Sequence, residues 1–349
     1  MASKPQSLRD AHVLLGHGSG GKMSAELINS VFLPAFQNPI LAAMNDQAAL
    51  AVGSARLAFT TDSFVVAPRF FPGGDIGHLA VNGTVNDLAM GGARPLYLSA
   101  SFIIEEGFPV DDLHRVAQSM AEAAHAAGVQ IVTGDTKVVE RGAADGLFIT
   151  TAGVGVIPDG RDLGPHRIRP GDLILCSGSI GDHGVAILSL RNGLDFGVSI
   201  ESDTAPLNGL VEEMLAAGGD GIHAMRDPTR GGVAASVNEW AQACRGRILL
   251  QEAAVPVRDE VRAVCELLGL EPFNVANEGK LLAVVAPEVA DEVLTAMRAH
   301  PLGREAAIVG EVQAAEVQAG QAGMVFIRTQ VGGTRPLEYP SGEQLPRIC

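Results

Sequence analysis

The sequence lacks the features that mark membrane, secreted or nucleic-acid-binding proteins. No apolar run approaches the roughly 20 residues needed to cross a bilayer, and the first ten residues, MASKPQSLRD, have no apolar core of a secretory signal. The 25 basic residues are outnumbered by 40 acidic ones, so the net charge of −15 repels nucleic acid and anionic lipid. These absences indicate a cytoplasmic protein with no nucleic acid and no membrane as partner.

Cysteine is also scarce. The four cysteines, Cys176, Cys244, Cys265 and Cys349, lie far apart and form no CxxC pair. This spacing argues against a zinc site and against a disulfide framework. Three of them stand in apolar segments and are expected to be buried, whereas Cys349 is the final residue.

What is present is enough apolar material for two domains. The chain has 349 residues, of which 47% are hydrophobic. The first half is predicted to be α+β, with strands at 57–61, 129–133 and 147–156 and a helix at 111–127 that Asp111 would cap and Gly128 would end. Arg169-Pro170-Gly171 interrupts the pattern, and a second, α/β run continues to about residue 328. We place the boundary near residue 160, which gives domains of 1–160 and 161–329.

The second domain is predicted to contain helices packed on a sheet. The expected helices are 183–190, 232–244, 258–268 and 288–299, and the expected strands are 172–176, 247–251, 280–285, 306–309 and 324–327. After Thr329 the periodicity stops, and the remaining sequence has too few apolar residues for a core. We therefore predict a mobile tail at 330–349, of which residues 336–349 would reach about 40 Å when extended.

A glycine-rich segment, GHGSGGK at residues 16–22, matches the first seven positions of a P-loop. Met23 then stands where a P-loop has Ser or Thr to bind Mg²⁺. Backbone of this kind can still approach phosphates closely as a lid over a nucleotide, and a plain flexible loop is the alternative. The residues of this lid that we expect to bind the nucleotide are Gly18, Gly20, Gly21 and Lys22.

Four aspartates of the first half are interpreted as lying at strand ends or turns. They are Asp46 in NDQAAL, Asp62 in TTDSF, Asp87 in GTVNDLAMGG and Asp135 in TGDTK. Each alone would be a turn cap, but four together favour a site for Mg²⁺ and triphosphate. Asp227 in MRDPTRGG precedes two glycines and a helix, whose free N–H groups would accept an anion.

Three further residues are candidates for the chemistry itself. Lys137 and Glu278 could transfer protons, although a solvated charge at a strand end is the ordinary explanation for both, and His17 and His183 carry the same reservation. Cys349 is a nucleophile on an arm that could visit two active sites in turn. A chance or merely metal-binding terminal thiol is the alternative.

These motifs together resemble a known family. In order, TTDSFVV, FFPGGDIGHLAVNGTVNDLAMGGARP, TGDTKVV, RDPTRGG, NEGK and the closing PRIC resemble the hydrogenase maturation family HypE, within the PurM-like superfamily of aminoimidazole ribonucleotide synthetase, selenophosphate synthetase and thiamine-monophosphate kinase. The resemblance spans nearly the whole chain. It implies an α+β N-terminal domain that pairs with its copy in a homodimer and an α/β C-terminal domain that closes over ATP. It also implies that Mg²⁺ and the phosphates are held by Asp46, Asp62, Asn86, Asp87, Asp135 and Asp227, and that Lys137 and Glu278 flank the group on Cys349.

The implied activity is the ATP-dependent dehydration of a carbamoyl group on Cys349 to a thiocyanate, which supplies cyanide for the iron of [NiFe]-hydrogenase. A HypF-type carbamoyltransferase would load Cys349, and a HypC–HypD-type complex would receive the cyano group. One alternative is a small-molecule phosphotransferase of the same superfamily. A selenophosphate synthetase, however, would carry a reactive Cys or Sec in its lid, and no cysteine precedes Cys176. The other alternative is a non-catalytic cysteine carrier or metallochaperone.

Overall fold

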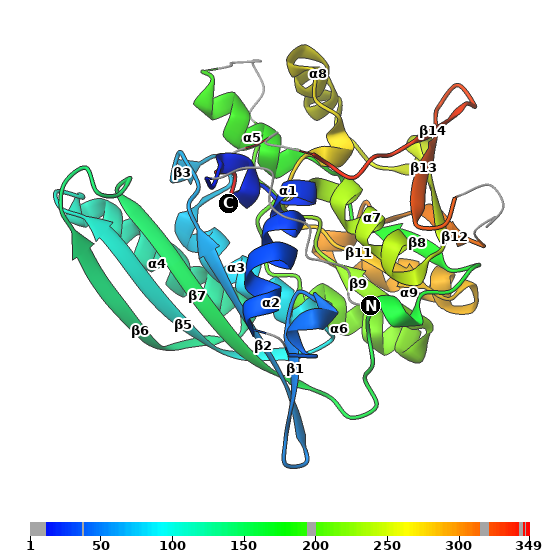
Figure 1. Cartoon of the computed structure of the whole chain (residues 1–349), viewed down its shortest axis with the longest axis horizontal. Coiled ribbons are helices and arrows are strands. Elements are labelled where there is room, and N and C mark those ends of the chain that lie inside the picture. Colours follow the sequence, from blue (N-terminus) through cyan, green and yellow to red (C-terminus); the bar gives the residue numbers. More distant parts are fainter. Residues whose placement is uncertain (1–11, 37, 194–199, 315–320, 342–344, 346) are drawn as a thin grey trace.

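The computed structural model describes residues 12–36, 38–193, 200–314, 321–341, 345 and 347–349. Two sheets organise the chain, one in each half, with helices on both (Figure 1). Within the described ranges, none of the helices is both long enough and apolar enough to cross a membrane.

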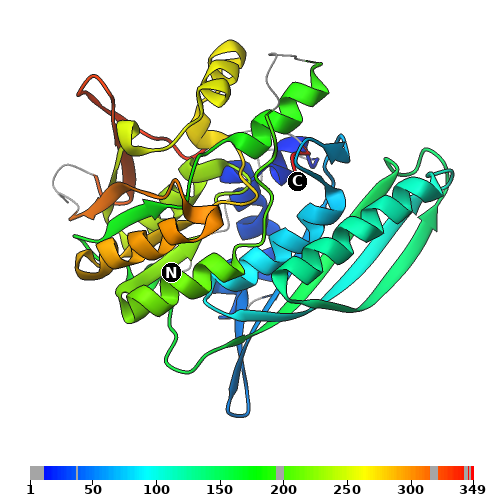
Figure 2. The same cartoon turned by 180° about the vertical axis from the view of Figure 1, so that it is seen from behind.

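The N-terminal sheet has five strands in the order β1-β2-β7-β5-β6. Their bounds are β1 Ala48–Val52, β2 Ala55–Phe64, β5 Arg94–Glu105, β6 Gln130–Val139 and β7 Leu147–Ile157. β5 and β6 are parallel and the other pairs are antiparallel. Helices α3 (Ile76–Met90) and α4 (Val110–Ala127) cover one face of this sheet, as the view from behind shows clearly (Figure 2). β6 forms an edge of the sheet.

The C-terminal sheet has seven strands in the order β14-β13-β10-β12-β8-β11-β9. Their bounds are β8 Leu173–Cys176, β9 Ile222–Arg226, β10 Arg247–Gln251, β11 Leu282–Val285, β12 Ala307–Gln313, β13 Met324–Arg328 and β14 Thr334–Pro336. One face packs on α7 (Gly232–Cys244), and the other packs on α6 (Asn208–Gly218) and α9 (Ala290–Ala299). Helices α5 (Asp182–Arg191) and α8 (Asp259–Leu268) join the apolar core of the N-terminal half instead. The two halves therefore share one core beside the cleft between them.

This architecture confirms the predicted fold class. The bounds of α7 and β10 coincide with the expected 232–244 and 247–251, and α4 ends on Gly128, whose φ of 69° is left-handed. The predicted start of α4 is wrong by one residue. The helix begins at Val110 after Pro109, so Asp111 lies in the first turn and does not cap it.

The interpretation of the aspartates as strand ends and turns is wrong for three of them. Asp87 lies inside α3, while Asp62 and Asp135 lie within β2 and β6. α3 gave no amphipathic signal because it is buried around nearly its whole circumference, so apolar and small residues occur on every side of it.

The expectation that the chain packs nowhere after Thr329 is wrong for residues 334–337. β14 pairs with β13, and Leu337 is buried in the core beneath α7. Leu345 and Ile348 are buried in the core of the N-terminal half. Residues 342–344 and 346 of the expected tail lie outside the described residues, and the mobility of the tail remains a prediction.

Candidate active site

A cleft of about 750 Å³ lies between the two sheets. Its apolar wall comes from the N-terminal helices and includes Leu27, Ile28 and Phe32. The opposite wall is polar and carries the carboxyl groups of Asp46, Asp62, Asp87 and Asp227. A cavity of this size, with one apolar side and a few convergent polar groups, is typical of a small-molecule site.

Four elements bring the carboxyl groups together. Asp62 comes from β2 and Asp87 from α3, while Asp227 follows β9 and Glu278 precedes β11. The hydroxyl of Thr60 donates to Asp87 Oδ2 at 2.8 Å and fixes that side chain against β2. The structure therefore joins residues from both domains, and Glu278 is 3% exposed rather than a solvated charge.

The cluster holds more negative charge than its surroundings neutralise. Burial, then Asp227 and Asp62, raise the pKa of both Asp87 and Glu278 well above the ordinary range. Burial and Asp46 raise the pKa of Asp227 to about 7. Glu278 Oε1 is a buried atom without a hydrogen-bond partner in the described part of the chain. Buried carboxyl groups in this condition favour a bound cation or proton.

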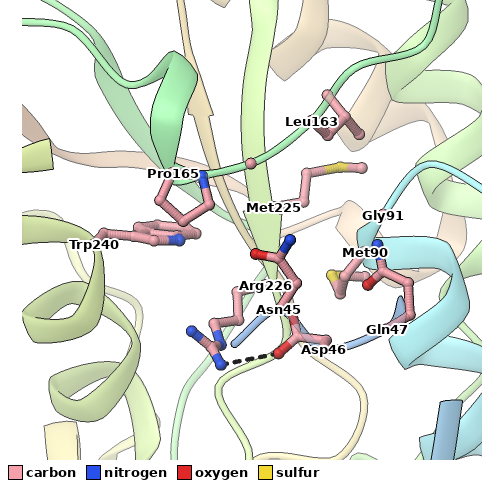
Figure 3. Close-up of a pocket in the computed structure, with 11 residues that line it drawn as sticks. Asn45, Asp46, Gln47, Met90, Gly91, Leu163, Pro165, Met225, Arg226 and Trp240 are labelled. Atoms are coloured by element: carbon pink, nitrogen blue, oxygen red, sulfur yellow. Dashed lines mark ion pairs between the residues drawn. The ribbon is translucent and has the colours of Figure 1, made fainter. Parts of the chain in front are cut away.

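Asp46 is the member of the set that is already paired. Its Oδ1 lies 3.0 Å from Arg226 Nη2 (Figure 3). Arg226 also pairs with Glu239. A smaller pocket beside this pair is lined by Gln47, Met90 and Trp240 among others. Arg226 partly neutralises the charge of Asp46. The better cation ligands are therefore Asp62, Asp87 and Asp227.

These residues fit Mg²⁺ by chemistry, although not as a complete cage. Across the residues that the structure places, no three His, Cys, Asp or Glu side chains stand close enough to hold a metal ion together. Mg²⁺ in phosphate sites takes one or two carboxylates, phosphate oxygens and water. A partial carboxylate set facing a cleft of this size suits that arrangement.

The predicted lid lies against the cleft. Residues 15–18 form a 3-10 turn and Gly21–Leu27 form α1. The described residues just before the turn, 12–14, are not in a strand, which is unlike the strand that leads directly into a P-loop. Gly20 has a φ of 78°, and a Cβ there would stand 2.8 Å from the carbonyl oxygen of Arg230. The Lys22 N–H donates to Pro340 O at 2.9 Å. Gly18 O accepts a hydrogen bond from Arg230, and Gly21 lies against Pro340, so the lid packs on the turn at Arg230 and on the tail.

Asn86 has a different environment from the one expected. Its amide donates to the carbonyls of Ala205 at 3.1 Å and Glu278 at 3.4 Å, and its Oδ1 accepts the N–H of Leu207 at 2.7 Å. All of these partners are backbone groups. In this structure Asn86 positions the backbone around Glu278 and does not face the cleft.

Cys349 lies in the same cluster. Burial, then Glu278, raise the pKa of its thiol above the ordinary range, and Arg230 acts in the opposite direction. The Val65 N–H donates to Cys349 O at 3.0 Å, and the Ala67 N–H donates to Arg347 O at 3.2 Å. The end of the chain is thus paired along residues 65–67 with its thiol beside the carboxylates.

Arg230 is a site residue that sequence reasoning missed. Its guanidinium donates to Gly18 O at 2.9 Å, and Cys349, Asp62 and Glu278 all raise its pKa. It therefore provides positive charge among the lid, the thiol and the carboxylates. The RDPTRGG motif contained the signal, since a cation three residues after Asp227 in a tight turn shares its surroundings.

Asp135 and Lys137 do not join the cluster. Lys137 Nζ lies 2.7 Å from Asp135 Oδ2, and both side chains are more than half exposed. The strand registers explain the separation. Asp135 pairs with Ser101, and Ser101 pairs with Thr150, so these three side chains lie on one face of the sheet. Asp62 pairs with Thr151, the residue after Thr150, which is fully buried. Asp135 therefore lies on the opposite face of the sheet from Asp62.

Comparisons with known proteins identify the family of the chain. Residues 44–157 match the AIR synthase related protein N-terminal domain, and residues 169–322 match the corresponding C-terminal domain. The carbamoyl dehydratase HypE of Rhizobium leguminosarum bv. viciae is 58% identical over 96% of this chain and 94% of that protein. A crystal structure of hydrogenase maturation protein HypE in complex with ATP has a TM-score of 0.82 and 51% identity, and covers 97% of this chain and 100% of that one. The HypE–HypF complex has a TM-score of 0.84 and 47% identity, and covers 90% of this chain and 99% of the matched chain.

Proposed function

Because the chain belongs to the HypE family of carbamoyl dehydratases, we propose that it converts a carbamoyl group on its own Cys349 to a thiocyanate at the expense of ATP. It acts in hydrogenase maturation, where the thiocyanate provides the cyanide ligand of the iron. The observation that carries the proposal is the position of Cys349. Its thiol lies close enough to Glu278, Arg230, Asp62 and Asp227 for their charges to shift its pKa, and Arg230, Asp62 and Asp227 also line the cleft that would take the nucleotide.

ATP makes the carbamoyl oxygen a leaving group. The oxygen attacks the γ-phosphorus, and the bond from phosphorus to the ADP oxygen breaks. The amide nitrogen then loses two protons as the C–O bond to phosphate breaks, which leaves S–C≡N, ADP and phosphate. Positioning and electrostatics dominate phosphoryl transfer of this kind. Arg230 lies where it would offset charge on the transferred phosphoryl group.

Glu278 is proposed as the proton acceptor. Burial, Asp227 and Asp62 raise the pKa of Glu278, and a carboxylate with a raised pKa is a stronger base once it is ionised. Arg230 favours the ionised form. Asn86 and Asp203 hold the backbone of Glu278, which restricts the movement of its carboxyl group.

Magnesium is proposed as the cofactor of ATP binding. It would supply positive charge that bridges phosphate oxygens to carboxylates. Asp62, Asp87 and Asp227 would hold it, with Asp46 in a supporting position because Arg226 already occupies one of its oxygens. The backbone of Gly18, Gly20 and Gly21, with Lys22, would cover the phosphates.

The assignment of Asp135 and Lys137 to the site depends on a second copy of the chain. The sheet face that carries them also exposes Phe59, Tyr97 and Ile103, at 41%, 49% and 44%. Apolar side chains in the middle of an otherwise uncovered sheet face favour burial against a partner. We propose a homodimer through this face, in which Asp135 and Lys137 of one copy approach the site of the other.

The remaining partners and the location follow from the reaction. A HypF-type carbamoyltransferase would load Cys349, as the solved complex of a HypE with HypF suggests, and a HypC–HypD-type iron complex would accept the cyano group. The four cysteines are free thiols, which suits the reducing cytoplasm.

Intact mass and tail-peptide mapping test the proposal directly. The protein is incubated with carbamoyl phosphate, ATP and a HypF-type partner. We expect a carbamoyl increment on Cys349 that loses the mass of water only when hydrolysable ATP is present, and no adduct on the tail of Cys349→Ser. Loss of water without ATP would refute ATP-dependent dehydration. No adduct at all, under conditions that load an authentic HypE, would favour the small-molecule phosphotransferase. A carbamoylated Cys349 that never loses water would favour the non-catalytic carrier.

A further inference from the structure

A buried histidine contacts the backbone of the tail one residue before the reactive cysteine. His183 is fully buried near the start of α5, and its Nε2 lies 2.8 Å from the carbonyl oxygen of Ile348. The two residues are 165 positions apart in the sequence, so this contact exists only when the tail is docked. Ile348 is itself 3% exposed, which places the hydrogen bond inside the core.

The hydrogen bonds around His183 fix its proton on Nε2. The Ile348 carbonyl can only accept, so Nε2 must donate. Nδ1 lies 2.8 Å from Ser202 Oγ, and this hydroxyl in turn accepts the Thr204 N–H at 3.2 Å. In a neutral ring Nδ1 then accepts the hydroxyl proton of Ser202. Burial lowers the pKa of His183, which favours the neutral ring.

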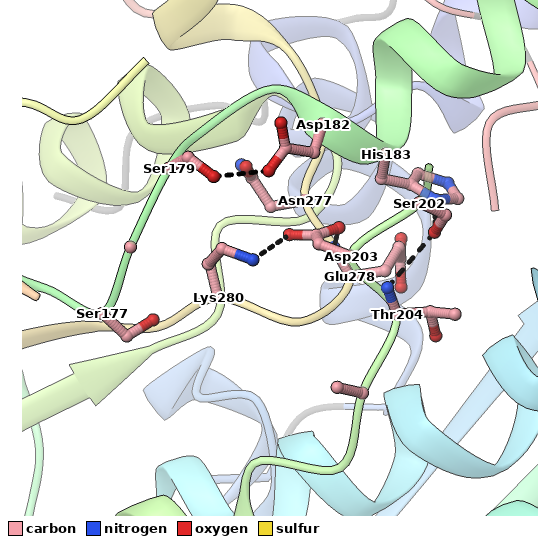
Figure 4. Close-up of polar contacts among 12 residues, drawn as sticks. Ser177, Ser179, Asp182, His183, Ser202, Asp203, Thr204, Asn277, Glu278 and Lys280 are labelled. Atoms are coloured by element: carbon pink, nitrogen blue, oxygen red, sulfur yellow. Dashed lines mark hydrogen bonds and ion pairs between the residues drawn. The ribbon is translucent and has the colours of Figure 1, made fainter. Parts of the chain in front are cut away.

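The loop that orients His183 also holds Glu278. Asp203 stands between Ser202 and Thr204, and its Oδ1 accepts the Glu278 N–H at 3.0 Å. Its Oδ2 pairs with Lys280 Nζ at 3.1 Å. Figure 4 shows His183 beside Ser202 and shows Asp203 next to Lys280 and Glu278. The three consecutive loop residues 202–204 thus connect two groups. One is His183, which contacts the tail, and the other is the backbone of Glu278, the proposed base.

We propose that His183 is a positioning residue that latches the docked tail through the Ile348 carbonyl, and that the 202–204 loop links this latch to Glu278. The effect of the latch on dehydration at Cys349 rests on the proposed function. The latch itself can be tested without measuring activity. Departure of the tail leaves a buried Nε2–H without its acceptor, which favours the docked state. The latch therefore shifts the equilibrium between a tail buried at the site and a tail available to a carbamoyltransferase.

The first test is the rate at which a small thiol reagent labels Cys349 in the full-length, ligand-free protein. His183→Phe keeps an aromatic ring against Phe71 but removes both ring nitrogens. Because one net hydrogen bond changes an equilibrium by about two- to tenfold, labelling of Cys349 should accelerate by about that factor. His183→Gln restores a donor near the position of Nε2 and should label close to the wild-type rate.

Two controls separate the latch from general loosening. His223→Phe removes a second buried histidine, which hydrogen-bonds Asp172 at 2.8 Å and does not touch the tail, and it should leave Cys349 labelling unchanged. Ser202→Ala keeps the His183 ring but frees its orientation, and should accelerate labelling by a smaller factor. If His183→Phe fails to fold, Ser202→Ala still tests the latch. Equal acceleration by His223→Phe, or wild-type labelling in both folded latch variants, would overturn the proposal.

The second test divides the reaction into its two halves. In His183→Phe, loading of Cys349 by the carbamoyltransferase should be as fast as in the wild type or faster, while the ATP-dependent loss of water from the loaded tail slows by about two- to tenfold. General damage would slow both halves. A wild-type protein that loads but never dehydrates would refute the proposed function, whereas the labelling rates would still decide the latch.

Discussion

Replacing Asp227 with Asn should stabilise the ligand-free protein while it weakens ATP binding. The pKa of Asp227 is about 7 in the folded chain, because burial and the neighbouring Asp46 oppose its ionisation, against an ordinary value of 3.8. Between these two values the unfolded chain binds fewer protons than the folded one at this position. The free energy of unfolding therefore falls as the pH rises from 3.8 to about 7, and it stays reduced above that.

The size of the effect follows from the same two values. A difference from 3.8 to about 7 corresponds to about 4 kcal/mol at pH 8, as an upper bound. Asp46 and Asp62 contribute to the raised pKa of Asp227 and can themselves bind part of the proton. We therefore expect the free energy of unfolding to rise by roughly half of the upper bound, about 2 kcal/mol. For a chain of this size that is an increase in Tm of about 3 °C.

Thermal unfolding at several pH values provides the assay. Asp227→Asn should have a higher Tm than the wild type at pH 8, and about half of that gain should remain at pH 5.5, midway between the two pKa values. The control is Glu105→Gln. Glu105 is an exposed carboxylate whose pKa is lowered by the N–H groups of Gly142 and Gly146, so its replacement should not raise the Tm at pH 8. An unchanged or lower Tm for Asp227→Asn at pH 8, or a gain that does not depend on pH, would refute the reasoning.

Two further predictions concern the same cleft. Asp87→Asn should weaken the binding of ATP in the presence of magnesium by about tenfold or more, measured by calorimetry, because a charge-assisted contact is lost; an unchanged affinity would remove Asp87 from the site. Gly279→Ala should lower the Tm by several degrees, because the added Cβ would stand 1.7 Å from the carbonyl oxygen of Asp203. Gly209→Ala in α6 is the control, since a Cβ added there would have its nearest neighbour 3.4 Å away. A Gly279→Ala protein as stable as Gly209→Ala would contradict the close approach.

The elements that the sequence predicted well are those with one apolar face. α4 and α7 each pack one side on a sheet, so their periodicity and their flanking residues located them within a residue or two. The sequence pattern did not predict α3, because the helix is enclosed by β2, β7 and α4 and has no polar stripe. Its burial is what places Asp87 inside the cleft, so the missed helix and the misread aspartate have one cause.

Part of the candidate cluster was predictable as residues, but its geometry was not. Asp62 and Asp135 both follow threonine or glycine in a strand, and nothing in their local sequence separates them. The separation comes from register, because pairing through β7 and β5 places them on opposite faces. The contact of His183 with Ile348 likewise depends on how a tail folds back across the chain, which local patterns do not report.

Arg230 connects the three parts of the site that must act together. It donates to the lid at Gly18, and its charge is stabilised by the thiol of Cys349 and by Asp62 and Glu278. In the ligand-free cleft this one guanidinium offsets several buried acids. The phosphates of a bound ATP would compete for the same cation, and a Mg²⁺ held by Asp62, Asp87 and Asp227 would supply positive charge to the carboxylates in its place. A nucleotide in the cleft would therefore change the charge around Cys349 before any group is transferred.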